Sequence, residues 1–224
     1  MHQSNLVIFL AEMAGTFGLL VAAAGSIVYD ARLGGSLGIG FIAISHFVGL
    51  GIMIFLFGRY SMAHFNPAVT IAYFVSRYIS ARQIPVYVLA QTIGAFLGVM
   101  FVKQFVGDYA NLGLNSPNYE YPVGMFFGIE VLATVFLMGS ILVAVNIKGL
   151  QKIFISSIIA GTVALDVFFF GTISGASMNP IRSLAPALFV NVLDDLWLYW
   201  TAPFVGSIIV ALLFNQIKKK LPQA

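Results

Sequence analysis

The sequence predicts an all-α membrane protein with six transmembrane helices, two re-entrant half-helices and an inverted 3+3 repeat. Three observations lead to this fold class. Of the 224 residues, 60% are hydrophobic and only 8% are charged, whereas soluble domains carry about 25% charged residues. Six apolar runs are long enough to cross a bilayer. An Asn-Pro pair also occurs twice, each time at the start of a shorter apolar run.

The six long runs each have the length of a transmembrane helix. A hydrocarbon core of about 30 Å requires about 20 apolar residues per helix. The first run is not expected to be a cleaved signal peptide, because it lacks a basic start and is too long. The runs lie at 6–28, 37–58, 84–106, 123–146, 153–173 and 197–217.

The two shorter runs, 66–76 and 179–190, are predicted to be half-helices. Proline disrupts a helix interior but is favourable at the first helical position, and asparagine is a favoured N-cap. Asn66 and Asn179 therefore predict two helix starts. At 1.5 Å per residue, a helix of about 11 residues is about 16 Å long, which reaches halfway across the bilayer.

The two halves of the chain, about 1–110 and 120–224, repeat one pattern. AEMAGTF around Glu12 resembles IEVLATVF around Glu130, and the Asn-Pro pairs correspond in the same way. Each half holds three long runs. Because three is odd, the second half must cross the membrane in the opposite direction. Inverted repeats of this kind place the functional site near the midplane, between the halves.

The segments before the half-helices, 59–65 and 174–178, are predicted to lie at membrane depth without helical hydrogen bonds. Such backbone is tolerated only where it is buried in protein or lines a water-filled cavity. Two re-entrant hairpins without a pore are the alternative, but the symmetric pairing favours a pore. The candidate pore-lining loop residues are Met62, Ala63, His64, Gly175, Ala176 and Ser177.

Basic residues indicate which side of the membrane each loop occupies. They follow the second, fourth and sixth runs, whereas the other loops carry acidic residues. Cytoplasmic loops collect Lys and Arg, so both termini are predicted to be cytoplasmic. The charges are too scattered to suggest nucleic acid binding, and no cysteine is present for disulfide or thiol chemistry. The basic residues in question are Arg59, Arg77, Arg82, Lys148, Lys152, Lys218, Lys219 and Lys220.

The ordered set of motifs resembles the aquaporin (major intrinsic protein) family over essentially the whole chain. These motifs are the paired Asn-Pro half-helices, the repeated Glu-x-x-x-Thr, GASMNP followed by Arg182, and WLYWTAPFVG near the C-terminus. The resemblance implies a single channel domain over 1–224 that conducts water passively and excludes protons and ions. It further implies a homotetramer in the lipid bilayer of a cell membrane. No cofactor, metal or enzymatic activity is expected.

The resemblance also implies roles for four polar residues near the midplane. Asn66 and Asn179 would cap their own helices through the side-chain oxygen and point their amide donors into the pore, where water accepts from both. The positive ends of the half-helices, each equivalent to roughly +0.5 charge, repel cations. Water held in this way interrupts a proton wire. Glu12 and Glu130 would accept hydrogen bonds from the loop amides.

The outer selectivity constriction is a further expectation from the resemblance. Strict water channels usually carry Phe and His at its first two positions, whereas a His opposite Val and Ala is similar to ammonia-permeable members. Permeability to ammonia or other small neutral solutes is therefore expected. Ser183 and the pair Tyr199–Trp200 resemble the water-selective pattern and disfavour glycerol. The four constriction residues are His46, Val167, Ala176 and Arg182.

Two residues depart from the family pattern. Ile181 replaces the usual alanine of the second motif and is expected to narrow or reshape the midplane. Met62 replaces a usual glycine at a position where a positive φ is expected.

Two of the constriction residues have alternative interpretations. Arg182, in the second half-helix, could be an arginine that snorkels to the interface. His46, in the second long run, could be a buried core residue.

Some of these residues are also compatible with other functional classes. The main alternative is an ion- or proton-coupled secondary transporter of a small solute that uses the buried acids Glu12, Glu130 and Asp166. Coupled flux would depend on a pH gradient, and passive flux would not. A closed junctional scaffold would add no permeability. A membrane enzyme is disfavoured, because the sequence has no metal-ligand cluster and no catalytic set of side chains.

Overall fold

The computed structural model describes residues 3–220, and all regular elements in this range are helices. The fold class predicted from the sequence is confirmed. Six helices have the length and hydropathy of membrane spans. They are α1 (Asn5–Arg32), α2 (Gly38–Ser61), α4 (Ile84–Phe105), α5 (Val123–Asn146), α6 (Lys152–Ser174) and α8 (Leu196–Lys220).

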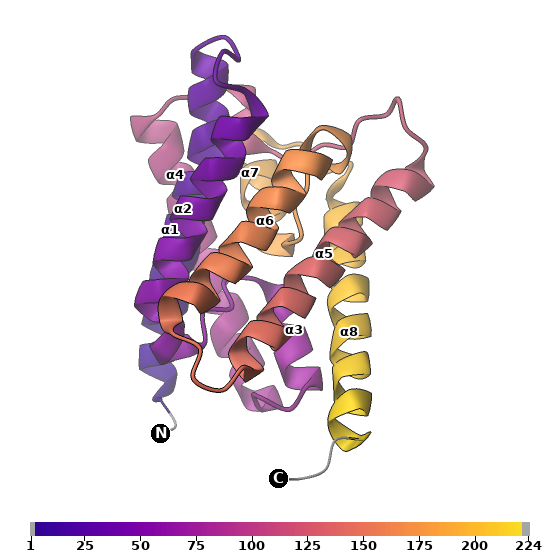
Figure 1. Ribbon diagram of the computed structural model, residues 1–224. Coiled ribbons are helices and arrows are strands. Elements are labelled where there is room, and N and C mark those ends of the chain that lie inside the picture. The colour runs from indigo at the N-terminus through magenta and orange to yellow at the C-terminus, as the bar shows by residue number, and fades with distance from the viewer. Residues whose placement is uncertain (1–2, 221–224) are drawn as a thin grey trace.

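The two half-helices start at the two prolines, as α3 (Pro67–Val75) and α7 (Pro180–Val190). Figure 1 shows α3 in the half of the bundle that contains both chain termini and α7 in the other half. We call these two ends of the bundle the terminal end and the distal end. Two short 3-10 helices, η1 (Ala81–Gln83) and η2 (Ala110–Gly113), lie in connections.

Left-handed residues end the helices that precede the two loops. Helix α2 ends at Met62, which has a φ of 64° and whose N–H donates to the carbonyl of Gly58. Helix α6 ends in the same way at Gly175, with a φ of 86° and a bond to Gly171. Caps of this kind stop a helix and turn the chain. Met62 thus has the positive φ that the sequence analysis expected.

Small residues allow the long helices to pack closely in each half. A side chain at Gly94 would collide with the backbone carbonyl of Met13, and one at Gly206 would collide with that of Val131. The first contact joins α4 to α1 and the second joins α8 to α5. Close approach at small residues is typical of helices in membranes.

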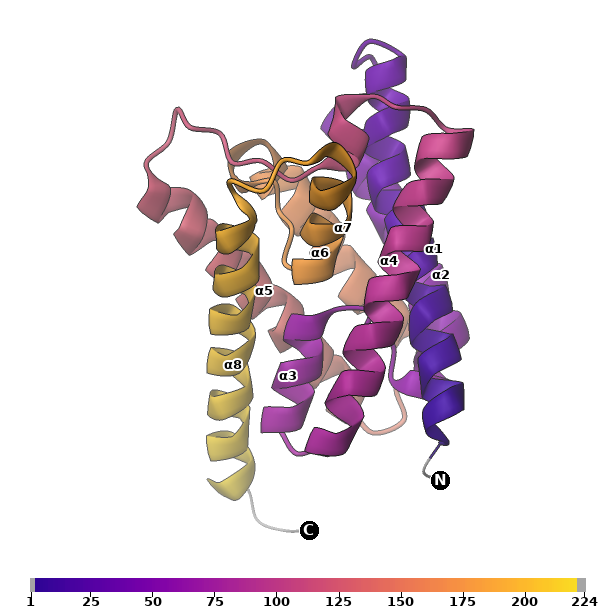
Figure 2. The same cartoon turned by 180° about the vertical axis from the view of Figure 1, so that it is seen from behind.

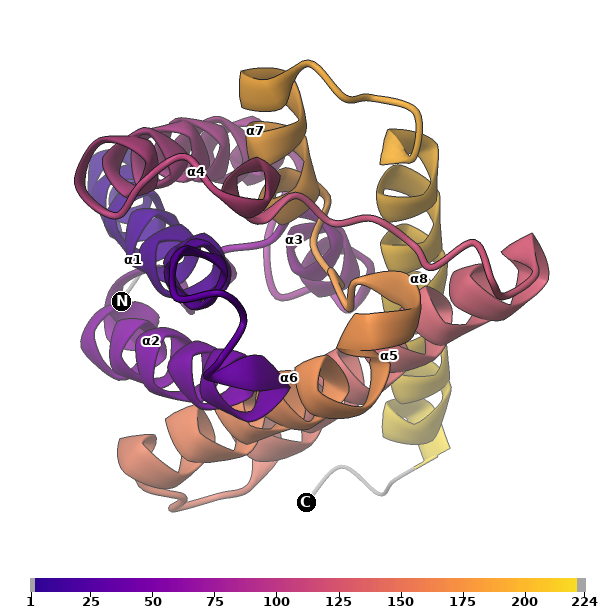
Figure 3. The same cartoon turned by 90° about the horizontal axis from the view of Figure 1, so that it is seen from above.

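Figure 3, viewed from the distal end, shows the long helices in a ring in which α7 fills the place between α4 and α8, with α3 below it. One extended hydrophobic cluster includes residues of both half-helices, such as Val69 and Ala185. Large apolar side chains on the outer faces remain exposed, for example Phe105 and Val143. This surface suits hydrocarbon rather than water, as expected for an integral membrane protein.

Candidate functional site

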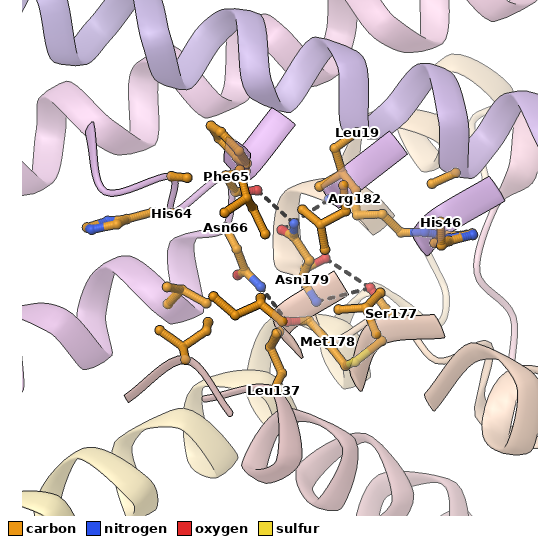
Figure 4. Close-up of a pocket in the computed structure, with 18 of the residues that line it drawn as sticks. Leu19, His46, His64, Phe65, Asn66, Leu137, Ser177, Met178, Asn179 and Arg182 are labelled. Atoms are coloured by element: carbon orange, nitrogen blue, oxygen red, sulfur yellow. Dashed lines mark hydrogen bonds between the residues drawn. The ribbon is translucent and has the colours of Figure 1, made fainter. Parts of the chain in front are cut away.

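A narrow cavity of about 50 Å³ lies between the two half-helices. Asn66 and Asn179 line its middle, and Figure 4 shows His64 and His46 on either side of them along the cavity. Few polar groups therefore converge on an otherwise apolar channel, which is the usual composition of a small-molecule site. The apolar lining includes Leu19, Leu50, Ile54, Val69, Ile141 and Ile159.

Both asparagines cap their own helices through the side-chain oxygen. Oδ1 of Asn66 accepts a hydrogen bond from the N–H of Ala68 at 2.8 Å. Oδ1 of Asn179 accepts one from the N–H of Ile181 at 3.1 Å. These bonds satisfy amides at the helix start that have no partner within the helix, and they fix the position of both amide groups at the cavity.

The amide nitrogens bond across the bundle, each to the loop of the other half. Nδ2 of Asn66 donates to the carbonyl of Met178 at 2.7 Å, and Nδ2 of Asn179 donates to the carbonyl of Phe65 at 2.9 Å (Figure 4). All these donors were predicted from the sequence to point into the pore. Because an amide nitrogen carries two hydrogens, one per asparagine remains for a solute.

Glu12 holds the first loop from α1. Its Oε1 accepts from the hydroxyl of Ser61 at 2.6 Å and from the N–H of His64 at 2.9 Å. Its Oε2 accepts from the N–H of Phe65 at 2.7 Å and from the side chain of Gln91 at 2.8 Å. The carboxylate is fully buried, and these four donors replace the water that it loses.

Glu130 holds the second loop from α5 in a parallel manner. Its Oε1 accepts from the hydroxyl of Ser174 at 2.8 Å and from the N–H of Ser177 at 2.9 Å. Its Oε2 accepts from the N–H of Met178 at 3.0 Å. Ala176 and Met178 have positive φ values of 42° and 53°, a strained backbone that needs such support.

Two tyrosines stabilise the same loops through hydrogen bonds, a role that was not predicted for either of them from the sequence. The hydroxyl of Tyr87 donates to the carbonyl of Ser61 at 2.8 Å. The hydroxyl of Tyr199 donates to the carbonyl of Ser174 at 2.7 Å. The signal that could have found them is the repeat itself, because both tyrosines occupy corresponding positions in the two halves.

The connection between α4 and α5, at the distal end, supplies two supports that were not predicted from the sequence. Nη1 of Arg182 donates to the carbonyl of Gly113, in η2, at 3.1 Å. Asn115 donates to the carbonyl of Gly175 at 2.7 Å and accepts from the hydroxyl of Ser183 at 2.8 Å. Arg182 has no carboxylate within ion-pair distance among residues 3–220. A backbone carbonyl therefore positions its guanidinium.

Four residues predicted for the constriction lie where the central cavity meets a second cavity. This distal cavity has a volume of about 240 Å³. His46 and Arg182 border both cavities, Val167 borders the distal one and Ala176 the central one. All four are between 2% and 5% exposed. The structure thus brings these residues together at one level of the bundle.

The hydrogen bonding of His46 defines what this level offers to a solute. Nδ1 of His46 lies 2.8 Å from the carbonyl of Ile42. A carbonyl can only accept, so Nδ1 carries the hydrogen, and in the neutral ring Nε2 is an acceptor. Arg182 provides donors at the same level. The junction therefore combines one acceptor and several donors with the small side chains of Val167 and Ala176.

His64 is held between two aromatic rings on the terminal side of the asparagines. Its ring stacks on Tyr73 with centroids 4.4 Å apart and on Tyr87 with centroids 4.1 Å apart. Its Nδ1 lies 3.1 Å from Oγ1 of Thr70. Among the other predicted loop residues, Ala63 and Ser177 also line the central cavity.

Several residues singled out from the sequence do not line the central cavity, and one of them, Gly175, borders the distal cavity instead. Met62 borders a separate cavity at the terminal end, together with Arg59. Ile181 packs in the hydrophobic core and is not among the residues that line the central cavity. Asp166 is 3% exposed, and its Oδ2 has no hydrogen-bond partner among the residues described.

Comparison with known proteins gives consistent matches. A family model described as "Major intrinsic protein" matches residues 1–214. The protein named "Probable aquaporin NIP7-1" from Arabidopsis thaliana is 35% identical over 218 residues, which cover 96% of this chain and 78% of that protein. Nodulin-26 from Glycine max is 34% identical over 211 residues, covering 93% of this chain and 77% of that protein.

A solved structure supports the likeness of fold. The aquaglyceroporin from Plasmodium falciparum matches with a TM-score of 0.86, covering 96% of this chain and 97% of that one. Sequence identity to it is 22%, so this match concerns the arrangement of helices alone.

Proposed function

The chain belongs to the major intrinsic protein family of passive small-solute channels, and from this premise we propose that it conducts water and neutral ammonia and excludes ions and protons. The observation that carries the proposal is the junction of the two cavities. There His46 and Arg182 provide polar groups, and Val167 leaves an apolar wall.

The central cavity supports water conduction with proton exclusion. A water molecule there meets donors from Asn66 and Asn179 and otherwise a largely apolar wall. Its oxygen is occupied by these donors, so it cannot accept a proton from the next water in the file. The positive ends of α3 and α7 add a field that opposes cations.

The distal junction supports ammonia passage. Ammonia has three donors and one acceptor, so it can donate to Nε2 of His46 and accept from Arg182. Val167 leaves more room than a histidine at that position would. The positive charge of Arg182 repels ammonium, so only the neutral species passes. Ser183 in place of the aspartate typical of glycerol-conducting members supports low glycerol flux, although the solved neighbour is described as an aquaglyceroporin.

Val167→His is expected to reduce ammonia conductance about tenfold, equivalent to about 1.4 kcal/mol in the barrier, while water conductance stays within a factor of about two. The added ring narrows the junction and places a polar group on its apolar side. The measurement is stopped-flow light scattering for water, glycerol and methylamine, with internal pH change under an ammonium gradient, in proteoliposomes. Val167→Ile is the matched control, because it adds bulk without polarity. A parent no faster than empty liposomes for ammonia, despite high water flux, would refute the ammonia part.

Asp166 is the observation that favours the alternative, a proton-coupled transporter. Its buried carboxyl oxygen without a partner could exchange a proton, whereas Glu12 and Glu130 are fully engaged with the loops. Coupling would make solute flux depend on an imposed pH gradient at constant solute gradient. Passive conduction predicts no dependence, which the same proteoliposomes can test.

We propose that the terminal end faces the cytoplasm. Helices α2 and α8 and the α5–α6 connection present basic residues there, such as Arg59, Lys148 and Lys218, which matches the distribution in cytoplasmic loops. A homotetramer in the cell membrane is the expected assembly, from the family alone.

Mercurials are expected to leave the parent channel open and to block Ala176→Cys. The chain has no cysteine, and Ala176 lines the central cavity beside the junction. A mercury adduct on the new thiol would occlude this narrow level. Water flux before and after HgCl₂, and again after a thiol reductant, measures the effect. Val143→Cys on the exposed outer face is the control. Block of the parent reversed by the reductant would contradict the prediction.

A further inference from the structure

A basic cavity at the terminal end, separate from the pore, is the basis of a further inference. Its volume is about 360 Å³, and its lining residues come from the C-terminal end of α3 and the last turns of α8, two helices that lie next to each other in Figure 2. We propose that this cavity binds a phosphate group, supplied by an anionic lipid headgroup or by a soluble phosphate. The lining residues are Ser76, Arg77, Tyr78, Asn215, Lys218 and Lys219.

No carboxylate side chain among residues 3–220 forms an ion pair with these cations. The eight acidic residues all lie elsewhere, in the distal connections or within the long helices. At the distal end, Lys103 has Asp108 as a partner, with Nζ and Oδ2 3.2 Å apart. At the terminal end, Arg77, Lys218 and Lys219 have no such partner among residues 3–220. Within the described residues these cations therefore lack a counterion, which a bound phosphate would supply.

Arg77 occupies a backbone position that favours glycine. Its φ is 64°. Its N–H donates to the carbonyl of Phe74 at 3.0 Å, and the N–H of Tyr78 donates to the carbonyl of Tyr73 at 2.9 Å. This pair of bonds is a Schellman motif, in which glycine is the usual residue at the position of Arg77. The left-handed conformation costs about 1 kcal/mol for a residue with a side chain. The chain therefore carries a cation at a position where the backbone favours glycine.

Neighbouring contacts arrange the other side chains before any ligand binds. Nζ of Lys218 lies 5.5 Å from the ring centroid of Tyr78, a cation–π contact. The hydroxyl of Tyr78 in turn donates to Oδ1 of Asn146 at 2.8 Å. Nδ2 of Asn215 donates to the carbonyl of Val75 at 2.8 Å. The last bond ties α8 to the end of α3, so both walls of the cavity are fixed.

Ser76 adds an unsatisfied donor to the same cavity. The residue is 4% exposed, and its buried hydroxyl has no hydrogen-bond partner among the residues described. Buried polar groups without a partner are rare and costly. A phosphate oxygen accepts from hydroxyls as well as from Lys and Arg. A small adjustment of Ser76 on binding would therefore satisfy its hydroxyl.

Apolar side chains beside the cavity agree with a lipid source. Phe74, Leu213 and Ile217 are 39%, 53% and 59% exposed, and they belong to the two helices that form the cavity. Acyl chains can cover these side chains while the headgroup phosphate reaches the basic residues. An alternative is that these basic residues only set the membrane topology or stabilise the C-terminal ends of the helices. In that case the cavity would show no preference for a phosphate ligand.

The test compares matched charge variants of the full chain by native mass spectrometry. The double variant Arg77→Gly with Lys219→Gln removes two cations of the cavity, and glycine suits the backbone of position 77, so folding is preserved. Arg82→Gln with Lys148→Gln removes two cations outside the cavity and is the control. The ligands are dioleoylphosphatidylglycerol, the phosphatidylcholine with the same acyl chains, and inorganic phosphate.

The parent and the control are expected to bind phosphatidylglycerol in preference to phosphatidylcholine. The cavity variant is expected to lose about thirtyfold in affinity, because each of the two removed basic residues near an anionic headgroup contributes about 1 kcal/mol. If inorganic phosphate binds the parent with the same dependence and the lipid does not, the phosphate source is soluble. Equal losses in the cavity and control variants, or no preference for any phosphate ligand in the parent, would overturn the proposal.

Discussion

Glu12→Ala is expected to destabilise the protein by about 3 to 6 kcal/mol and to abolish water conductance. The substitution removes the acceptor for the N–H groups of His64 and Phe65, which belong to a loop with positive φ values and cannot turn towards other partners. Each buried donor left without a partner costs about 1 to 3 kcal/mol. Ser61 and Gln91 also lose an acceptor, which adds to the cost.

Thermal unfolding of the purified protein and stopped-flow water flux measure this effect. Glu12→Gln is the matched variant, because one acceptor oxygen remains, and its melting temperature should lie between those of the parent and the alanine variant. Glu120→Ala, at an exposed distal position, controls for the loss of a carboxylate. A melting temperature and water flux equal to the parent values in Glu12→Ala would show that the loop holds its shape without the carboxylate.

The spans and half-helices could be predicted from the sequence because their signals are local. The length of an apolar run predicts a membrane span, and an Asn-Pro pair predicts a helix start. The predicted run 179–190 therefore differs little from α7, which is Pro180–Val190. Helix α1 extends beyond the predicted run 6–28 to Asn5–Arg32. The apolar pattern marks the hydrocarbon thickness, whereas backbone hydrogen bonding continues into the polar layer.

The cross-bundle contacts could not be predicted in the same way. For example, the carbonyl of Met178 accepts one amide hydrogen of Asn66. This bond depends on the distance between the two halves, which no local sequence pattern encodes. Gly113 and Asn115 support Arg182 and Gly175 from a connection without periodicity. That connection has no counterpart in the first half, so the internal repeat gave no signal for it.

The two halves hold each other through a reciprocal arrangement. Glu130 fixes the N–H of Met178, and the carbonyl of Met178 accepts from Asn66. In the other half, Glu12 fixes the N–H of Phe65, and the carbonyl of Phe65 accepts from Asn179. Each asparagine is therefore positioned by the acid of the opposite half. A displacement of one loop would shift the amide donors of both asparagines.

Asn179→Asp is expected to raise proton and cation leakage at least about tenfold, equivalent to about 1.4 kcal/mol in the barrier, while water conductance changes little. Aspartate keeps the oxygen that caps α7. It loses the donor to the carbonyl of Phe65 and places a negative charge between two helix ends of roughly +0.5 each. The field that opposes cations is thereby offset. A pH-sensitive dye in proteoliposomes under an imposed membrane potential measures the leak.

Two controls separate charge from structural damage in this experiment. Asn179→Ser keeps a capping oxygen without the charge, so it should remain tight to protons if the charge is the cause. Asn191→Asp makes the same chemical change at the exposed C-terminal end of α7, outside the cavities described, and should behave as the parent. If Asn179→Asp folds, conducts water and leaks no more than Asn191→Asp, the field of the half-helices is not what excludes cations. The exclusion would then have to come from Arg182 at the distal junction alone.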